Sequence, residues 1–156
     1  MASEGPSLLR AAGLRVTAPR LAVLAAIPYG QHLDADTITQ TVRGQLGRVS
    51  TQAVYDVLNV FTTSGLLRRI ELPGQTSARY ERRVGDNHHH LVCRSCRNVI
   101  DVDCAVGDAP CLTPSVDGGY AIDEAEVVYW GLCPACRPAD EAAGSVPLYP
   151  EEAKHD

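Results

Sequence analysis

The sequence of 156 residues lacks the features that would place it in a membrane or in a secretory pathway. No apolar run approaches the roughly 20 residues that a membrane-spanning helix needs, and the N-terminus lacks the layout of a signal peptide. It also lacks internal repeats, apart from one short cysteine motif that occurs twice. We therefore expect one small domain or two very small ones, located in the cytoplasm, where thiols stay reduced.

Charge is distributed unevenly along the chain. The net charge of −5, if spread evenly, would argue against nucleic-acid binding. Residues 1–85 carry ten Lys/Arg and six Asp/Glu, whereas residues 86–156 carry four and thirteen. A basic first half joined to an acidic second half indicates DNA contact by the first half. Charge asymmetry alone is equally consistent with ordinary surface solvation, so the motifs must decide.

Two Cys-x-x-Cys pairs are the strongest chemical signal in the second half. The pairs are separated by 36 residues, and four thiolates in this pattern suit one tetrahedral structural Zn²⁺ per subunit. The alternatives are disulfides or a thioredoxin-like redox pair, but a redox pair would need a βαβ context, which we do not find. The predicted ligands are Cys93, Cys96, Cys133 and Cys136.

Three consecutive histidines, His88 to His90, stand directly before the first cysteine pair. Successive side chains of a strand point to opposite faces, so His88 and His90 would share one face. The segment therefore predicts two imidazoles on one side of a strand that leads into the zinc ligands.

The first half predicts a series of short helices followed by a β-hairpin. The helix from Ser50 to about Ser64 has the clearest pattern, with Ser50 as N-cap and Gly65 as its stop. A strand at 66–72, a turn and a strand at 77–81 follow it. Helices in this order before a hairpin predict a winged-helix DNA-binding domain over residues 1–83. Shorter helices are expected at 7–12, from Thr17 to Ile27, and after Asp34 or Asp36.

The polar face of the Ser50 helix carries side chains that can contact base edges and phosphates. Arginines before it and in the hairpin could reach the DNA backbone. The alternative is an ordinary amphipathic helix with a solvated polar face. The predicted DNA-binding residues are Arg15, Arg20, Thr51, Gln52, Tyr55, Asn59 and Arg68.

Residues 84–87 form the expected hinge, and residues 88–137 a small α/β dimerisation domain, which makes the whole fold α+β. Strands are expected at 91–93, 99–102 and 126–130. Such a sheet is small for a core of its own, so zinc would contribute to its folding. Residues 138–156 have no periodicity, and we expect a disordered tail.

Five sequence motifs occur in a fixed order along the chain: Arg15-Val16-Thr17-Ala18-Pro19-Arg20, Ser50-Thr51-Gln52-Ala53-Val54-Tyr55, Gly65-Leu66-Leu67, His88 to Cys96, and Tyr129 to Cys136. With these motifs in this order, the chain resembles the ferric uptake regulator (Fur) superfamily over about residues 7–136. Within it, residues 84–90 and 103–107 resemble the peroxide-sensing FurA/CatR (PerR-like) branch. The resemblance implies a homodimeric repressor, not an enzyme, that binds a palindromic operator in double-stranded DNA and controls catalase-type genes.

The resemblance also implies a regulatory metal site that draws ligands from both halves and fixes the angle between them. Its nitrogen and oxygen ligands suit Fe²⁺ or Mn²⁺, one per subunit. Aspartate at position 101 goes with peroxide sensing in the family, through oxidation of His32 or His88, whereas glutamate goes with plain iron sensing. The implied ligands are His32, Glu81, His88, His90 and Asp101.

Some residues depart from the family pattern. Ala125 and Asn87 stand where many members have histidines of a third metal site, so we expect no such site. Asp56 stands where an arginine often follows the Val-Tyr pair, and would repel phosphate if it faced DNA. Cys104 and Cys111 lie outside the zinc set; they are either structural thiols or a redox pair that forms a disulfide.

Three other functions remain open at this point. The first is an iron-sensing repressor of iron-uptake genes. The second is a small metal-dependent hydrolase, which lacks a His-Glu-x-x-His motif and would leave the winged helix without a purpose. The third is a zinc-ribbon interaction module, which explains the cysteines but neither His32 nor the basic first half.

Overall fold

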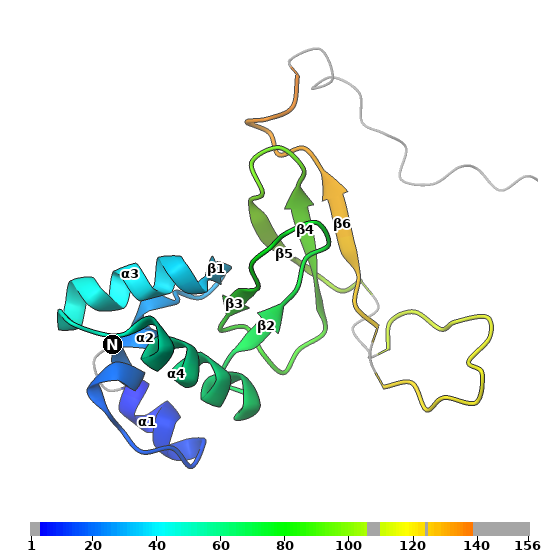
Figure 1. Cartoon of the computed structure of the whole chain (residues 1–156). Coiled ribbons are helices and arrows are strands. Elements are labelled where there is room, and N and C mark those ends of the chain that lie inside the picture. Colours follow the sequence, from blue (N-terminus) through cyan, green and yellow to red (C-terminus); the bar gives the residue numbers. More distant parts are fainter. Residues whose placement is uncertain (1–3, 106–109, 124, 139–156) are drawn as a thin grey trace, which may run out of the picture.

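The computed structural model describes residues 4–105, 110–123 and 125–138. Its first part consists of helices that pack side by side. In Figure 1 they lie to the left, away from the strands labelled β4, β5 and β6. The bounds of the helices are Glu4–Ala11 (α1), Ala18–Ala26 (α2), Ala35–Leu46 (α3) and Thr51–Thr63 (α4).

Short polar side chains begin the two longest helices, as the sequence predicts. Asp34 caps α3, where its Oδ1 accepts a hydrogen bond of 2.7 Å from the backbone N–H of Thr37. Ser50 caps α4 in the same way, with its Oγ 3.1 Å from the N–H of Ala53. After α4, Gly65 has φ of 71°, a left-handed conformation that glycine adopts without steric cost. These predicted helix ends are confirmed.

One apolar core holds the helices together. The largest side chains in it are almost completely buried, and they come from every helix of the first part. Burial of such side chains is the main term that stabilises helices of this length, because isolated short helices are marginal in water. The most buried members are Leu9, Val23, Ile38, Leu58 and Phe61.

A small antiparallel sheet follows the helices, with the strand order β1-β3-β2. Its strands are Leu33–Asp34 (β1), Arg68–Ile70 (β2) and Arg79–Glu81 (β3). The hairpin of β2 and β3 is predicted by the sequence, although both strands are shorter than expected. The two-residue β1 is not predicted, because it is too short to show alternation. It pairs with β3 and brings the preceding residue, His32, towards the end of the hairpin.

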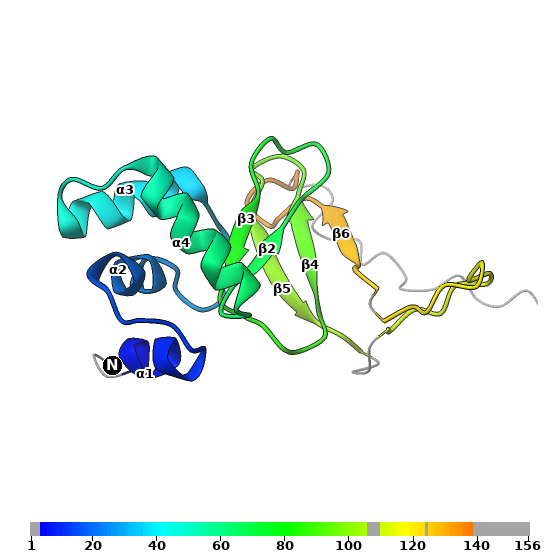
Figure 2. The ribbon, with the colours of Figure 1, turned by 60° about the horizontal axis from the view of Figure 1, so that its bottom comes forward.

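The second sheet has the order β5-β4-β6, with β5 antiparallel and β6 parallel to the central strand. Its strands are His88–Cys93 (β4), Val99–Asp103 (β5) and Val128–Gly131 (β6). Figure 2 shows the helices and this sheet on opposite sides of the β2–β3 hairpin.

The expected α/β dimerisation domain needs correction, because its described residues, 88–105, 110–123 and 125–137, contain no helix. The segment between β5 and β6 includes Pro110, Pro114, Gly118 and Gly119 in its described part. Proline removes a backbone donor and glycine disfavours the helical state, so this composition does not support a helix.

The hairpin also packs against the second sheet. Ile70 and Leu72 are buried in one apolar cluster with Val92 and Val99, and Trp130 packs at its edge. Residues 82–87, which include the expected hinge at 84–87, connect the two sheets without regular structure. Most of the expected tail, residues 139–156, lies outside the described residues. Within the described ranges, the helices are too short or too polar to cross a membrane.

Two candidate metal centres

The predicted regulatory ligands converge where the first part meets the second sheet. His32 precedes β1, Glu81 ends β3, His90 lies in β4 and Asp101 lies in β5. One ligand atom from each of these four residues lies within 4.8 Å of all the others. The fold thus brings together residues from four separate strands or their ends.

His32 and Glu81 make the closest contacts in this cluster. The Nε2 atom of His32 lies 2.9 Å from Oε2 of Glu81 and 2.8 Å from Oδ1 of Asp101. Oε1 of Glu81 lies 3.1 Å from Nε2 of His88 and 3.4 Å from Nε2 of His90. His88 and His90 therefore share one face of β4, as strand alternation predicts.

The cluster is buried, and its polar atoms are poorly satisfied by one another. Nε2 of His32, Oε2 of Glu81, Nε2 of His90 and Oδ1 of Asp101 are inaccessible to solvent and have no well-oriented hydrogen bond among the described residues. Buried polar groups without partners are rare in folded proteins. A divalent cation at the centre would satisfy all four atoms at once, so these residues fit a metal.

The environment of Glu81 favours its ionised form, which is the form that binds a cation. Burial tends to raise its pKa, but hydrogen bonds and positive charge from His32 and His90 outweigh burial and hold the pKa well below its usual range. The carboxylate is therefore ionised at neutral pH. Because it is almost completely buried, it needs a cationic partner in the folded state.

Three supporting residues were not predicted. Nδ1 of His88 lies 2.8 Å from Oδ1 of Asp86, and Arg83 donates to Asp86 at 2.6 Å. Arg79 donates to the carbonyl oxygen of His32 at 3.1 Å, which fixes the backbone there. A metal-binding histidine usually directs its second nitrogen to a carboxylate or another acceptor. Asp86, only two residues before His88, is therefore the one supporting residue that the sequence could have indicated.

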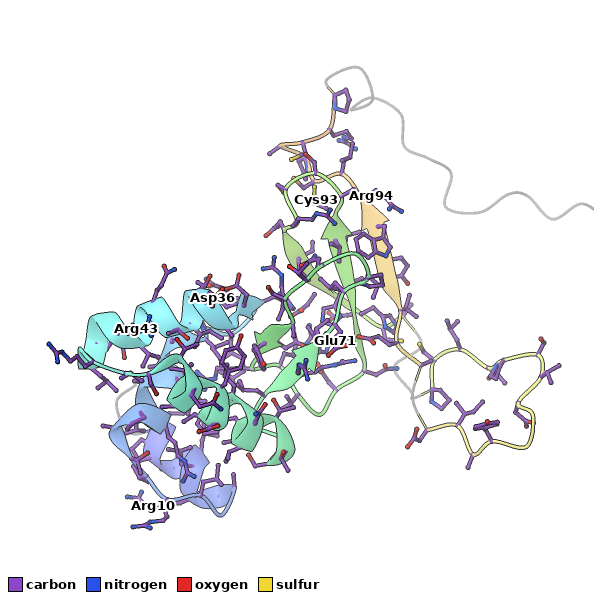
Figure 3. All side chains as sticks on the ribbon, in the orientation of Figure 1. Arg10, Asp36, Arg43, Glu71, Cys93 and Arg94 are labelled. Atoms are coloured by element: carbon purple, nitrogen blue, oxygen red, sulfur yellow. The ribbon has the colours of Figure 1, made fainter. Side chains whose placement is uncertain are left out.

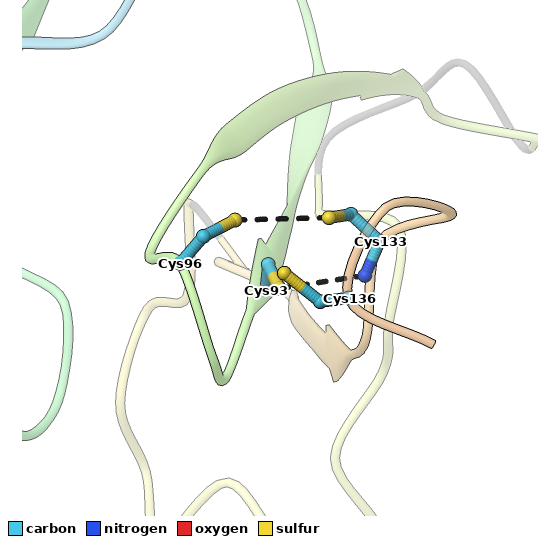
Figure 4. A group of neighbouring side chains, drawn as sticks. All are labelled: Cys93, Cys96, Cys133 and Cys136. Carbon is cyan, nitrogen blue, oxygen red and sulfur yellow. Dashed lines mark hydrogen bonds between the residues drawn. The ribbon is translucent and has the colours of Figure 1, made fainter. Parts of the chain in front are cut away.

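The second centre is formed by the four predicted zinc ligands, whose sulfur atoms all lie within 4.8 Å of one another. Figure 4 shows the two Cys-x-x-Cys turns facing each other, with 3.7 Å between the sulfurs of Cys96 and Cys133. Two thiolates on one tetrahedral Zn²⁺ are about 3.8 Å apart, given Zn–S bonds of about 2.3 Å. The backbone N–H of Cys133 donates to Sγ of Cys93 and lowers the pKa of that thiol to about 6. The donor set therefore fits zinc.

This zinc-type centre lies far from the helices. Figure 3 shows Cys93 and Arg94 at the end of the second sheet that is most distant from α1 to α4. The turns between the paired cysteines extend beyond the ends of β4 and β6. A metal there would join β4 to β6 without touching the histidine cluster.

The predicted DNA-contacting residues of α4 are all exposed: Thr51, Gln52, Tyr55 and Asn59. Arg43, at the end of α3, donates to the hydroxyl of Thr51 at 3.0 Å and braces the turn between the helices. Gln52 donates to Oδ1 of Asp56 at 2.8 Å. Asp56 therefore belongs to the same exposed face, where part of its charge is engaged by a neighbouring amide.

The predicted arginines are placed differently from one another. Arg15 is exposed, whereas Arg20 is half-buried and donates to the carbonyl oxygen of Arg15 at 2.8 Å. Arg68 is half-buried and lies 3.7 Å from Oε1 of Glu126, which precedes β6. Arg68 thus contacts the second part of the chain, and its role in DNA binding stays a prediction.

The model of the Ferric uptake regulator family matches residues 11–109, and the chain belongs to this family of metal-dependent transcription regulators. It is therefore a regulator and not an enzyme, as expected from the sequence. Regulators of this family bind DNA and are dimeric.

Among similar proteins, the transcriptional regulator FurA of Mycobacterium tuberculosis H37Rv is 60% identical over 132 residues, which cover 85% of this chain and 89% of that protein. Ferric uptake regulation protein 1 of Mycolicibacterium fortuitum is 60% identical over 123 residues, or 79% of this chain and 76% of that protein. The structure of the Vibrio cholerae ferric uptake regulator superposes with a TM-score of 0.61 at 25% identity, covering 83% of this chain and all of that chain.

Proposed function

We propose that this chain is an iron-responsive transcriptional repressor that binds a palindromic operator as a homodimer when its regulatory site holds Fe²⁺, with Mn²⁺ as a substitute. The main observation behind this proposal is the buried cluster of histidines and carboxylates, whose members come from both parts of the chain. The names of similar proteins support an iron sensor, since two relatives at 60% and 56% identity are called ferric uptake regulation proteins.

The proposed regulatory ligands are His32, Glu81, His88, His90 and Asp101. A bound divalent cation would supply the positive charge that compensates the buried carboxylates. His32 and Glu81 belong to the first part, whereas the other three lie on the second sheet. Ligation by both groups would hold the helices at one angle to that sheet. In a dimer, this angle decides whether two recognition helices can enter successive major grooves.

In this proposal, residues 1–83 act as a winged-helix domain, 84–87 as the hinge and 88–137 as the dimerisation domain. Support for the first comes from the order of α3, α4 and the β2–β3 hairpin, with α4 presenting its exposed polar face. One structural Zn²⁺ per subunit would occupy the four-cysteine centre and stabilise the small second sheet. The exposed apolar side chains of that sheet, Leu91, Ile100 and Tyr129 among them, suit an interface between subunits.

The test is operator binding measured with and without metal. DNA fragments from upstream of iron-uptake genes and of catalase-type genes would be compared by fluorescence anisotropy, with Fe²⁺ under anaerobic conditions and with Mn²⁺. We expect tight, metal-dependent binding of iron-uptake fragments and its loss in the H32A variant. Equal binding with and without metal would contradict the proposal, and selective binding to catalase-type fragments would favour the second candidate.

The second candidate is the peroxide-sensing repressor that the resemblance implied, for which the names of the closely matching relatives give less support. The observation that favours it is the position of Asp101 beside His32. In the family that the sequence resembles, aspartate at this position goes with peroxide sensing. Ferrous iron in the site would supply an electron to H₂O₂ next to its imidazole ligands.

Mass spectrometry separates the two candidates. Protein loaded with Fe²⁺ and treated with H₂O₂ would be digested, and its peptides mapped. One added oxygen on the peptides that contain His32 or His88, absent from protein loaded with Mn²⁺, is the result expected of the peroxide sensor. Unmodified histidines would leave the iron sensor as the supported function.

A further inference from the structure

A third group of metal-ligating side chains lies on the opposite face of β4 from the histidine cluster. His89 points away from His88 and His90, and its Nε2 lies 3.3 Å from Sγ of Cys111. Cys104 follows β5 directly. The ligand atoms of His89, Cys104 and Cys111 all lie within 4.8 Å of one another. Neither the regulatory site nor the four-cysteine centre uses any of these residues.

His89 is buried although its side chain is polar. The residue is only 4% exposed, and its ring packs edge-on against that of Tyr129, with 6.3 Å between the ring centroids. Its Nδ1 atom is buried and has no hydrogen-bond partner among the described residues. A buried imidazole in a strand, where an apolar side chain would pack well, is costly unless its nitrogens have partners.

The chemistry of the three groups selects a soft cation. Two thiolates and one imidazole suit Zn²⁺ or Cu⁺, whereas the carboxylate-rich regulatory site suits harder ions. An imidazole nitrogen and a thiolate on one tetrahedral zinc ion are about 3.5 Å apart, from bond lengths of about 2.0 Å and 2.3 Å. The distance of 3.3 Å between His89 and Cys111 is close to this value.

We propose that His89, Cys104 and Cys111 form an additional binding site for a soft metal ion, Zn²⁺ or Cu⁺. Three protein ligands leave the fourth tetrahedral position open, so an ion there exchanges more readily than one in a closed four-cysteine site. Cys111 is half-buried and is followed by the exposed Leu112, so the site is accessible from solvent. A bound ion would tie both ends of the segment between Cys104 and Cys111 to the central strand. This inference does not depend on which signal the regulatory site senses.

Cobalt is the probe that distinguishes this site from the other two. Reduced, zinc-loaded protein would be titrated anaerobically with Co²⁺ in the presence of a phosphine reductant, and the visible and near-ultraviolet spectrum recorded. A thiolate-to-cobalt charge-transfer band can arise here only at a cysteine-containing site, because the regulatory ligands are nitrogen and oxygen atoms. Zinc released during the titration would be measured, so that displacement from the four-cysteine centre is recognised.

We expect one Co²⁺ per subunit with a charge-transfer band and no released zinc. The C104S and C111S variants should bind this ion at least about 100-fold more weakly, because even indirect supports of a metal ligand contribute 10- to 100-fold. The T113S variant, a similarly small change two residues beyond Cys111, should bind like the wild type. The circular dichroism spectrum and zinc content of each variant check that it is folded.

Competition then identifies the ion. Displacement of cobalt by one equivalent of Zn²⁺ assigns the site to zinc, whereas displacement by Cu⁺ in the presence of a chromophoric Cu⁺ chelator assigns it to copper. Absence of a charge-transfer band in the wild type would overturn the proposal. So would a band of full intensity in C104S and C111S, or a Cys104–Cys111 disulfide that persists under these reducing conditions.

Discussion

The Nε2 atom of His32 lies 2.8 Å from the Oδ1 atom of Asp101, and this contact joins the helical part of the chain to the second sheet. His32 lies in the loop before β1, and Asp101 is the central residue of β5. Both atoms are buried and lack well-oriented hydrogen bonds in the described structure. The contact therefore places two metal-type ligands across the boundary that a regulator would have to control.

Removal of His32 should weaken the regulatory site more than the rest of the protein. In the H32A variant we expect the affinity for Mn²⁺ to fall by at least about 100-fold, because a direct ligand is lost. Isothermal titration calorimetry of zinc-loaded protein measures this change. The Q31A variant, at the exposed neighbouring position, is the control and should bind like the wild type. Unchanged affinity in H32A would remove this residue from the ligand set.

Removal of Cys96 should affect a different centre. In the C96S variant we expect loss of the tightly held zinc and a lower melting temperature, because metal binding contributes to the folding of the second sheet. Zinc content and thermal unfolding measure the two effects. T113S, at an exposed position outside every proposed metal site, is the control and leaves all four sulfurs of the zinc-type centre in place. Retention of a full equivalent of zinc by C96S would argue against the assigned ligands.

Loss of the Asp34 side chain should destabilise the start of α3. Its carboxylate accepts from the N–H of Thr37, and replacing such a cap by alanine costs about 1 kcal/mol of unfolding free energy. Denaturant unfolding of D34A at neutral pH measures this value. The D34N variant keeps an acceptor at the same place, so it should lose only a small part of the stability.

The same residue gives a stability change with a defined sign of pH dependence. The backbone hydrogen bond from Thr37 is the main cause that holds the pKa of Asp34 below its usual value, against the opposing effect of burial. The contribution is present above the unfolded-state pKa of about 3.9 and is lost as the pH falls through the lower folded-state pKa. The difference in unfolding free energy between the wild type and D34N should therefore shrink on acidification. A difference independent of pH would show that the charge of Asp34 contributes nothing.

Arg15 offers a test of DNA contact, since its side chain is exposed before α2. The R15A variant should bind DNA fragments of any sequence more weakly, and the slope of log affinity against log salt should fall by about 1. Titrations at several salt concentrations give the slope. R137A, an exposed arginine beyond the second cysteine pair, is the matched control and should leave the slope unchanged. Equal slopes for the two variants would remove Arg15 from the DNA surface.

Local features of the fold were predictable because they depend on nearby residues. Asp34 and Ser50 mark the starts of α3 and α4 by a hydrogen bond that spans three residues. The alternation that pairs His88 with His90 is equally local. The short strand β1 was not predictable, since it exists only through pairing with Tyr80 and Arg79 far along the chain.

Predictions about the site divide in the same way. The cysteine spacing indicates a zinc-type centre without knowledge of the fold, whereas His32 and Asp101 could be joined only through resemblance to a family. The proximity of His89 to Cys111 and the support of His88 by Asp86 were both missed. Spacing along the chain gives no sign of the first contact, because tertiary packing of the loops decides which side chains meet, whereas Asp86 lies only two residues before His88.

Packing of the hairpin against the second sheet bears on how this protein can be divided for study. A fragment that ends near residue 83 would contain all four helices and both strands of the hairpin. It would also leave Ile70 and Leu72 without Val92 and Val99, and present two bare aliphatic side chains to water. Such a fragment should aggregate at concentrations that the whole chain tolerates, and I70T/L72T should restore its solubility. The boundary that is most convenient in the sequence is thus a poor place to cut the chain.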